Sequence, residues 1–498
     1  MKRNLILLIA ALCFIKLAIH LVGNQNYGFH RDELLHVSVS EHLAAGYMEF
    51  PPFVAFAAKA ATAIFGHSLS GIRFLSTLAG IGILILTCLM TIEIGGKTPA
   101  SVFVGGMAVL AFLPFYRNHT LFQPVAFDQF FWTLGFYFVV RFLNTKDNRN
   151  LIYAGVTAGF GLLNKYTFVV WLAGVIIALL FYDRGTVFKN KTLYLAFAIS
   201  VAMAFPNVIW QIQHDFPAII HQQRLAEVQL EKLDRFEFLT EQLEFPLTLS
   251  LSLLGLYGLF GHPEIKKFRL VGIAVVLIFL AMWALRAKPY YVFAAYPVLF
   301  AAGAAMLHQI CKSRQVVQYG TGLLLFLPVV YYIPRLTPVL PIEKYVEYRE
   351  IEPDSVGRYI LTNDYADMFG WNEQVALIDS VYRSLPSGEM RDAVIWAENY
   401  GEAGAIKILG DRFGLPDPFC ISGSFWTFGP PPAEYSACIT VGIEPDLAHH
   451  VFEDVTLVKM IRHRYAIDEE NNIPVYICRK PRMNLHERWP EFKKYIFN

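Results

Sequence analysis

The chain has 498 residues, of which 55% are hydrophobic, 15% aromatic and only 17% charged. This composition and a mean hydropathy of +0.41 are typical of a membrane protein with a soluble remainder. Lys and Arg number 42 against 41 Asp and Glu, so the net charge is close to zero and nothing indicates nucleic acid as a partner. The expected partner of most of the chain is therefore the lipid bilayer.

Apolar stretches long enough to cross a bilayer recur over the first two thirds of the chain. The first follows the basic Met1-Lys2-Arg3 and has no clear small-residue cleavage site, so we expect an uncleaved transmembrane helix. About eleven spans are predicted, at roughly 4–22, 70–94, 100–116, 120–143, 150–164, 166–182, 191–210, 245–261, 268–286, 290–310 and 316–334.

The positions of Lys and Arg predict the orientation of these spans. With the N-terminus in the cytoplasm, the inner connections fall at 95–100, 141–150, 183–191, 261–269 and 311–315, and each carries Lys or Arg, Arg184 among them. An odd number of spans then places the outer loops 23–69 and 211–244 on the opposite face, together with everything after Arg335. We expect a multi-pass membrane protein with an extracytoplasmic tail.

The last third of the chain turns soluble, with Asp, Glu, Gly and Pro between short runs. Strand-like and helical runs alternate there, at 374–385, 393–396, 401–413 and 474–478. The predicted fold class is therefore mainly α, with a polytopic helical domain over 1–335 and a small α/β domain over 336–498.

Cysteine and histidine patterns give no metal or cofactor signal. The six cysteines lack any CxxC spacing, and one disulfide among Cys420, Cys438 and Cys478 is left open. His30, His36 and His42 recur every six residues, which is not the spacing that pairs ligands on a helix. The chain has no P-loop, GxSxG or HExxH motif. No cofactor is required, and Mg²⁺ or Mn²⁺ stays open without support from a motif.

Two acidic positions stand out beside the predicted spans. Asp32 and Glu33 lie in the first outer loop, where a carboxylate accepts a proton from an incoming hydroxyl or binds a cation. The alternative is an ordinary helix start, since acidic residues favour a first helical turn. Asp128 lies among aromatic residues, where a lone carboxylate needs a partner or a ligand, or else caps a helix at the membrane surface.

Cations and phenols gather at a second place near the outer boundary. The segment 286–291 contains Lys288, Tyr290 and Tyr291, and Lys165 interrupts an apolar stretch elsewhere. Such a group suits a phosphate. The alternative is snorkelling beside an aromatic belt, which we favour for Arg286 alone.

The stretch 29–56, FHRDELLHVSVSEHLAAGYMEFPPFVAF, resembles the first outer loop of bacterial GT-C membrane glycosyltransferases. The family 39 and 83 branches, which include protein O-mannosyltransferases and the lipid A aminoarabinose transferase, share its aromatic-Arg-Asp-Glu and Gly-Tyr…Pro-Pro order. The similarity extends through Asp128, 164–166 and 288–291. The tail motifs 399–405 and 422–430 look like the extra domain of many bacterial members.

The resemblance implies an inverting enzyme of the bacterial inner membrane that moves a sugar from a polyprenyl phosphate to an acceptor hydroxyl at the outer face. The acceptor is a protein, a lipid or a glycan, and the sugar is not specified. By analogy, Asp32 is the general base or the carboxylate that positions the acceptor, with Glu33 supporting it and Asp128 as the second acidic member of the site. The implied phosphate ligands are Lys288, Tyr290, Tyr291 and Lys165, and the implied loop and acceptor-positioning residues are Arg31, His42, Tyr47, Pro51 and Pro52.

The competing class is a transporter or lipid-linked-sugar flippase that uses the same carboxylates for ion coupling. That class predicts acidic groups in mid-span and repeats between halves of the chain. The acidic pair falls in a loop and no internal repeat is visible. A membrane-anchored binding module is a third interpretation, but eleven spans exceed what an anchor requires.

Overall fold

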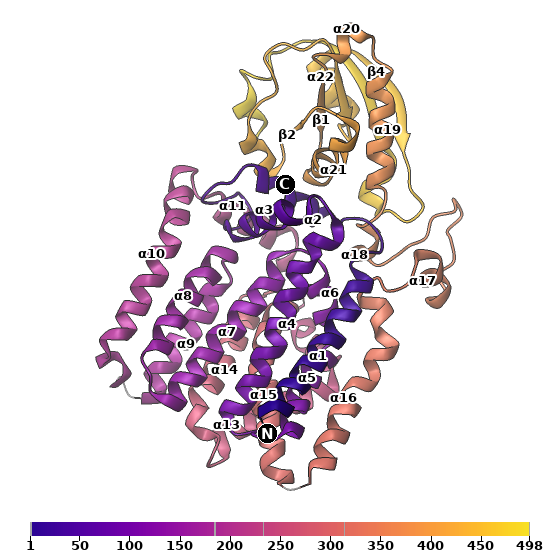
Figure 1. Cartoon of the computed structure of the whole chain (residues 1–498). Helices are drawn as coiled ribbons and strands as arrows, with labels where there is room; N and C mark the ends of the chain where they lie inside the picture. Colours follow the sequence, from indigo (N-terminus) through magenta and orange to yellow (C-terminus); the bar gives the residue numbers. More distant parts are fainter. Residues whose placement is uncertain (1, 184–185, 233, 313, 498) are drawn as a thin grey trace.

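The computed structural model describes residues 2–183, 186–232, 234–312 and 314–497, so Arg184 of the predicted inner connection lies outside them. The first two thirds form a helical bundle, and a small mixed α/β part lies at one end of it (Figure 1). The long helices of the bundle are α1 (Lys2–Gly23), α4 (Leu69–Ile94), α5 (Pro99–Ala111), α7 (Pro124–Thr145), α8 (Arg149–Asn164), α9 (Phe168–Asp183), α10 (Lys191–Gln213), α13 (Pro246–Gly261), α14 (Arg269–Ala284), α15 (Tyr296–Cys311) and α16 (Gln315–Leu336).

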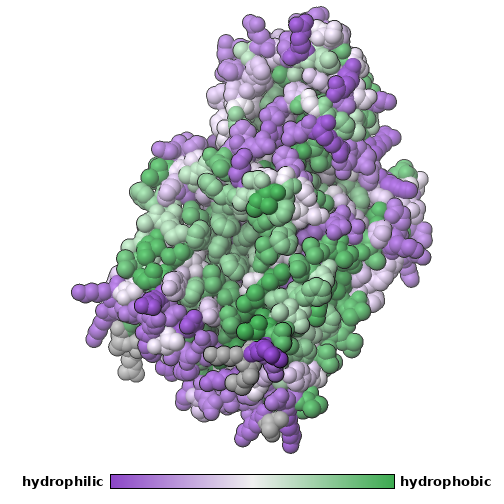
Figure 2. Space-filling view, viewed as in Figure 1, coloured by the Kyte–Doolittle hydropathy of each residue, from purple (hydrophilic) through white to green (hydrophobic). Residues whose placement is uncertain are grey.

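The bundle has the surface of a membrane protein. Six helices of the described residues are long and apolar enough to span a bilayer, or up to eight if each of two bent pairs is one span. The predicted count of eleven is therefore not confirmed. Helices α8 and α9 have only 16 residues each, which shortens the stretch available for crossing. Figure 2 shows apolar side chains over much of the bundle's visible face and hydrophilic ones over the C-terminal part.

Two sharp bends interrupt the bundle. Helix α5 meets α6 (Pro114–Thr120) at 71°, and α12 (Arg235–Leu243) meets α13 at 98°. Pro114 and Pro246 stand at the first turns of α6 and α13, where a missing backbone N–H costs nothing and the fixed φ suits a new helix. These bends leave room at the end of the bundle that faces the C-terminal part.

Short helices lie between the bundle and the C-terminal part (Figure 1). They are α2 (Arg31–Ser38) and α3 (Phe53–Phe65) of the predicted loop 23–69 and α11 (Pro217–Val228) of the predicted loop 211–244. The short 3₁₀ segment Pro289–Ala295 carries Tyr290 and Tyr291, follows Lys288 directly and leads into α15. Of the other residues predicted to carry chemistry, Asp32 and Glu33 lie on α2, whereas Asp128 lies on α7 and Lys165 follows α8 in the bundle.

The C-terminal part contains a five-stranded sheet in the order β2-β1-β3-β5-β4. Strand β1 pairs in parallel with β2 and β3, whereas β5 pairs antiparallel with β3 and β4. Its elements are α17 (Ile342–Tyr348), α18 (Asn363–Ala366), α19 (Trp371–Arg383), α20 (Ser387–Met390), β1 (Val394–Ala397), α21 (Tyr400–Gly410), β2 (Pro418–Cys420), β3 (Cys438–Val441), α22 (Pro445–Val451), β4 (Phe452–Ile461) and β5 (Ile473–Pro481). The predicted strands and helices of this part are confirmed. Its three cysteines, Cys420, Cys438 and Cys478, are free and buried.

Candidate active site

Helix α2 begins with a capping box and carries two adjacent carboxylates, Asp32 and Glu33, in its first turn. The His30 ring accepts a hydrogen bond from the Asp32 N–H, and Glu33 accepts one from the His30 N–H at 2.9 Å. Because successive helical residues point about 100° apart, Asp32 and Glu33 face different surroundings.

Glu33 turns into the bundle and is completely buried. Its Oε2 lies 2.8 Å from Nη2 of Arg73 on α4, and its Oε1 accepts the Phe122 N–H at 2.8 Å. Arg73 also has no exposed surface, so the pair is closed to solvent and joins α2, α4 and the start of α7. Glu33 was predicted to support Asp32 chemically, but the structure places its carboxylate outside the lining of both cavities described below.

Asp32 turns the other way and is half-buried. Its Oδ2 accepts a hydrogen bond from Gln123 Nε2 at 3.0 Å, and its Oδ1 accepts one from the Tyr400 hydroxyl at 3.1 Å. Burial alone would raise the pKa of Asp32, but the nearby charges, above all His30, and the Tyr400 hydrogen bond bring it below the ordinary value. The ionised form, which accepts a proton, is therefore favoured.

Two cavities meet at Asp32. The larger, of about 1010 Å³, runs between the α5–α6 bend, the α12–α13 bend and α16, and we call it the large cavity. The smaller, of about 400 Å³, lies under the segment 23–69 beside α11 and the C-terminal part, and we call it the loop cavity. Residues that line both are Asp32, Gln123, Lys288 and Tyr290. These four side chains define a junction with a carboxylate, an amide, a cation and a phenol.

Two lysines near the junction have no carboxylate within ion-pair distance among the described residues. Lys288 lines both cavities, and Lys165 lines the loop cavity. The Lys165 ammonium lies 4.2 Å from the centre of the Tyr291 ring and 5.4 Å from that of Tyr290, a cation–π geometry. The structure thus brings together the side chains that were predicted to bind a phosphate. Arg286 lies apart from them and donates to the Glu231 carbonyl.

Asp128 lies on α7 below the loop cavity and lines neither cavity. It is buried, and its carboxylate accepts hydrogen bonds from Trp132 Nε1 at 3.1 Å and Thr167 Oγ1 at 3.4 Å. Thr167 itself lines the loop cavity two residues after Lys165. Asp128 therefore contacts the wall that carries Lys165, and only indirectly the cavity.

The predicted loop-positioning residues divide between three places. Tyr47 is buried and donates to the Val39 and His42 carbonyls, which pins the loop. Pro51 lines the loop cavity, and Pro52 precedes α3 as its cap. His42 stacks on Phe428 at 4.0 Å in a separate small cavity.

Arg31 points into the C-terminal part. Its guanidinium lies 2.8 Å from Glu469 and 3.4 Å from Asp367, and it also approaches the buried Glu470 at 3.9 Å. One oxygen each of Glu470 and the buried Glu402 has no hydrogen-bond partner among the described residues. Arg31 is therefore a link between α2 and an acidic pocket rather than part of the junction.

This pocket predicts a pH-dependent stability. Burial raises the pKa of Glu470 to about 8, far above its unfolded value, so the folded state holds a proton that the unfolded state releases. The stabilisation is complete below about pH 4 and is lost as pH rises towards 8. We expect Glu470→Gln to abolish roughly 2–4 kcal/mol of this pH-dependent change. Thermal unfolding of the full chain between pH 5 and 8.5 measures it.

The control for this variant is Glu469→Gln, which neutralises an exposed neighbour that also contacts Arg31. We expect the Glu469 variant to keep the wild-type slope of stability against pH. Equal slopes for wild type and Glu470→Gln would contradict the assignment.

Four residues of this region were missed by sequence reasoning. Gln123 and Tyr400 hold Asp32, Arg73 holds Glu33, and Arg117 lines the large cavity while pairing with Asp364 at 2.7 Å. A buried arginine within an apolar stretch, as at Arg73, was a usable signal because such a charge needs a partner. Gln123 and Tyr400 carry no signal of this kind.

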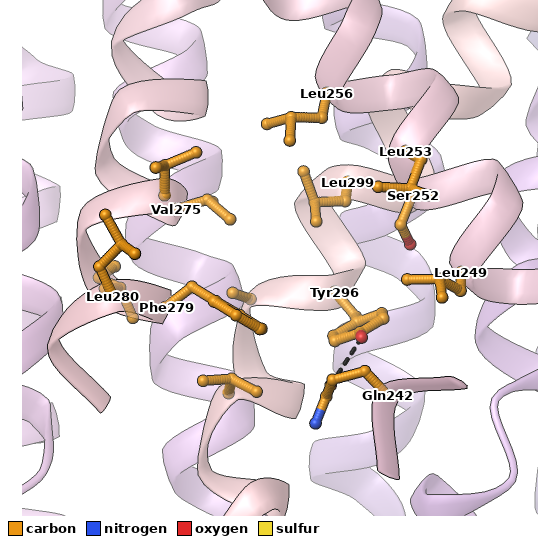
Figure 3. A pocket seen from close by; sticks show the side chains of 14 residues that line it. Gln242, Leu249, Ser252, Leu253, Leu256, Val275, Phe279, Leu280, Tyr296 and Leu299 are labelled. Atoms are coloured by element: carbon orange, nitrogen blue, oxygen red, sulfur yellow. Dashed lines mark hydrogen bonds between the residues drawn. The ribbon is translucent and has the colours of Figure 1, made fainter. Parts of the chain in front are cut away.

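A separate, apolar cavity of about 230 Å³ lies between α13, α14 and α15 (Figure 3). Leucine, valine and phenylalanine side chains surround it, and the Tyr296 hydroxyl donates to Gln242 Oε1 at 2.7 Å at one end. Its walls have the chemistry of a hydrocarbon site. Among the described residues, no group of three or more His, Cys, Asp or Glu is placed to hold a metal ion.

The described residues thus form a bundle of apolar helices with a small α/β part at one end, and a carboxylate and two lysines lie where the two parts meet. The chain is similar in fold to ArnT from Cupriavidus metallidurans, with a TM-score of 0.58 over 95% of this chain and 97% of that chain, at 12% identity. The same protein bound to undecaprenyl phosphate matches equally well, over 94% of this chain and 97% of that chain. The predicted GT-C resemblance is confirmed.

Sequence comparisons match glycosyltransferases as well. The family model described as dolichyl-phosphate-mannose-protein mannosyltransferase matches residues 49–210. The lipid A galacturonosyltransferase RgtD of Rhizobium johnstonii is 24% identical over 53% of this chain and 56% of its own length. The core galacturonosyltransferase RgtB of the same organism is 27% identical over 36% of each chain. This chain thus spans about half or less of the curated relatives it matches.

Proposed function

We propose that this protein is an inverting glycosyltransferase that moves a sugar from a polyprenyl phosphate to an acceptor hydroxyl at the outer face of a bacterial inner membrane. The observation that carries the proposal is the junction, where ionised Asp32 and the Lys288 cation line the same two cavities. A base and a phosphate-binding cation at the meeting point of two cavities suit a reaction between two substrates. The proposal includes a cytoplasmic N-terminus and a C-terminal domain outside the cytoplasm.

The chemistry follows from these positions. The acceptor oxygen attacks the anomeric carbon while its proton passes to Asp32, and the bond from that carbon to the phosphate oxygen breaks. The electron pair leaves with the polyprenyl phosphate, whose added negative charge Lys288 stabilises. One displacement inverts the anomeric configuration. Gln123 and Tyr400 donate to Asp32 from two sides and leave its remaining lone pairs free for the incoming hydroxyl.

The donor's lipid chain suits the large cavity, whose walls include Leu113, Phe245 and Leu325 between the two bends. The loop cavity, which Asp32, Glu49 and Lys165 line, suits a sugar ring. ArnT was solved with undecaprenyl phosphate, and the relatives are named for mannose or galacturonic acid. We therefore propose a polyprenyl-phosphate donor and test mannose, galacturonic acid and aminoarabinose as its sugar.

The test is transfer by the purified full chain in lipid nanodiscs, supplied with each undecaprenyl-phosphate-linked sugar and a lipid A acceptor. We expect one donor to be consumed, and Lys288→Ala to raise its KM roughly 10- to 100-fold, since it loses a charge-assisted contact to phosphate. Lys266→Ala, an exposed lysine outside both cavities, is the matched control. A Lys288 variant with the KM of the Lys266 variant would contradict the phosphate assignment.

A further inference from the structure

Two motifs of the C-terminal part, 399–405 and 422–430, have no role in the reaction as described so far. The first begins at Asn399, whose side chain accepts the N–H groups of Gly401 and Glu402 and so starts α21. The Glu402 carboxylate in turn accepts a hydrogen bond from the Asn399 N–H, which completes a capping box. The cap fixes Tyr400 at the first position of α21.

Helix α21 lies directly against α2. A Cβ atom at Gly404 would lie 2.8 Å from the Leu34 Cβ, closer than real contacts allow, and 3.0 Å from the Leu34 carbonyl carbon. Glycine at this position therefore lets the two backbones approach. The approach is what brings the Tyr400 hydroxyl within 3.1 Å of Asp32, across 368 residues of chain.

Tyr400 is held in the form that donates. Burial, with the charge of Asp32 beside it, raises the pKa of Tyr400 well above its ordinary value, so the hydroxyl keeps its proton. The Arg31 guanidinium lies 5.7 Å from the centre of the Tyr400 ring, in a cation–π geometry that holds the ring in place. The hydroxyl has one acceptor within reach among the described residues, the Asp32 carboxylate.

The second motif, 422–430, binds another carboxylate of the loop cavity, that of Glu49. Gly423, at a φ of +58°, and Ser424 approach Glu49, which accepts the Ser424 N–H at 2.8 Å and the Ser424 hydroxyl. A Cβ at Gly423 would collide with Glu49 Oε1. The chain end contributes as well, because Ile496 and Phe497 line the same cavity. Each tail motif therefore holds one carboxylate of the loop cavity.

From these contacts we infer that the C-terminal domain completes the active site, with Tyr400 as the positioning residue for Asp32. The inference rests on the proposed glycosyl transfer and adds to it a residue from outside the membrane bundle. The Tyr400 hydroxyl fixes one oxygen of Asp32, so that the other faces the junction beside Gln123. Without that bond the carboxylate rotates and its charge loses one of its two neutral donors.

The test variant is Tyr400→Phe, which keeps the ring and removes only the hydroxyl. We expect kcat to fall roughly 10- to 100-fold, the value of a hydrogen bond to a charged group, with the donor KM unchanged. The acid limb of the kcat/KM profile should move to higher pH, because a lost donor raises the pKa of the carboxylate. In the wild-type protein and in the variant, the same charged or titratable groups face Asp32: His30, Arg31, His36, Arg117, Lys288, Tyr290, Asp364 and Asp367.

The matched control is Tyr382→Phe, which removes a hydroxyl of α19 that donates to the Met390 carbonyl at 2.8 Å, away from both cavities. A purely structural role for Tyr400 would lower the melting temperature without moving the acid limb. Gly404→Ala is a second variant that pushes α21 from α2 without removing a polar group, and it should move the limb in the same direction. A Tyr400→Phe profile that matches the Tyr382→Phe profile would overturn the inference.

A measurement without substrate separates this inference from the proposed function. Melting temperatures of Tyr400→Phe, Asp32→Ala and the double variant form a cycle. We expect the two changes to be non-additive, since each removes the same bond. Additive shifts would overturn the inference whatever the enzyme transfers, whereas a wild-type chain that uses none of the donors would overturn only the proposed reaction.

Discussion

Asp32→Asn should reduce glycosyl transfer by roughly 10²- to 10⁴-fold, the contribution typical of a general base. The amide keeps the size of the side chain and one oxygen that accepts from Gln123 or Tyr400, but it cannot take a proton from the acceptor hydroxyl. We expect the donor KM to change little, because Lys288 still lies at the junction. Initial rates over a range of donor concentrations, in the nanodisc assay above, measure both constants.

The matched control is Asp147→Asn, an exposed acidic residue outside both cavities. Its rate should equal that of wild type. The melting temperature of Asp32→Asn should also stay near the wild-type value, since the half-buried carboxylate is bound only by neutral donors. Transfer at the wild-type rate by Asp32→Asn would remove Asp32 from the mechanism.

The neighbouring carboxylate should behave in the opposite way. Glu33→Gln leaves the Arg73 guanidinium buried without its counter-ion, and loss of one partner of such a pair costs about 3–5 kcal/mol. We expect a large drop in melting temperature and in the yield of folded protein, with kcat per folded molecule retained. Thermal unfolding in detergent and active-site-normalised rates separate the two effects.

A double variant, Glu33→Gln with Arg73→Met, tests the reason for that loss. Replacing both charges removes the unpaired ion, so part of the stability should return relative to Glu33→Gln alone. If Glu33→Gln melts like wild type but has lost activity, Glu33 belongs to the chemistry and not to the scaffold.

The hydropathy of the sequence predicted the membrane bundle because apolar runs of this length occur mainly in segments that cross a bilayer. The predicted count of eleven spans is not confirmed, because the chain bends at Pro114 and Pro246 and because α8 and α9 are short. Such bends depend on tertiary room at the end of the bundle. A hydropathy profile does not contain that information.

The site could be predicted where a residue type is unusual for its place. Asp32, Lys165 and Lys288 are charges beside apolar runs, and the structure brings all three to the cavities. The partition between Asp32 and Glu33 needed the position of Arg73, which the sequence places 40 residues away. Tyr400 was out of reach, because a tyrosine in a soluble segment has no pattern that names a partner far away in the chain.

The bond between Tyr400 and Asp32 also has a consequence for biosynthesis. Ribosomes synthesise the carboxylate of Asp32 first and its tyrosine partner 368 residues later. A nascent chain therefore contains Asp32, Lys165 and Lys288 before it contains the domain that covers them. Chains truncated before Tyr400 should consume lipid-linked sugar more slowly than chains that contain α21.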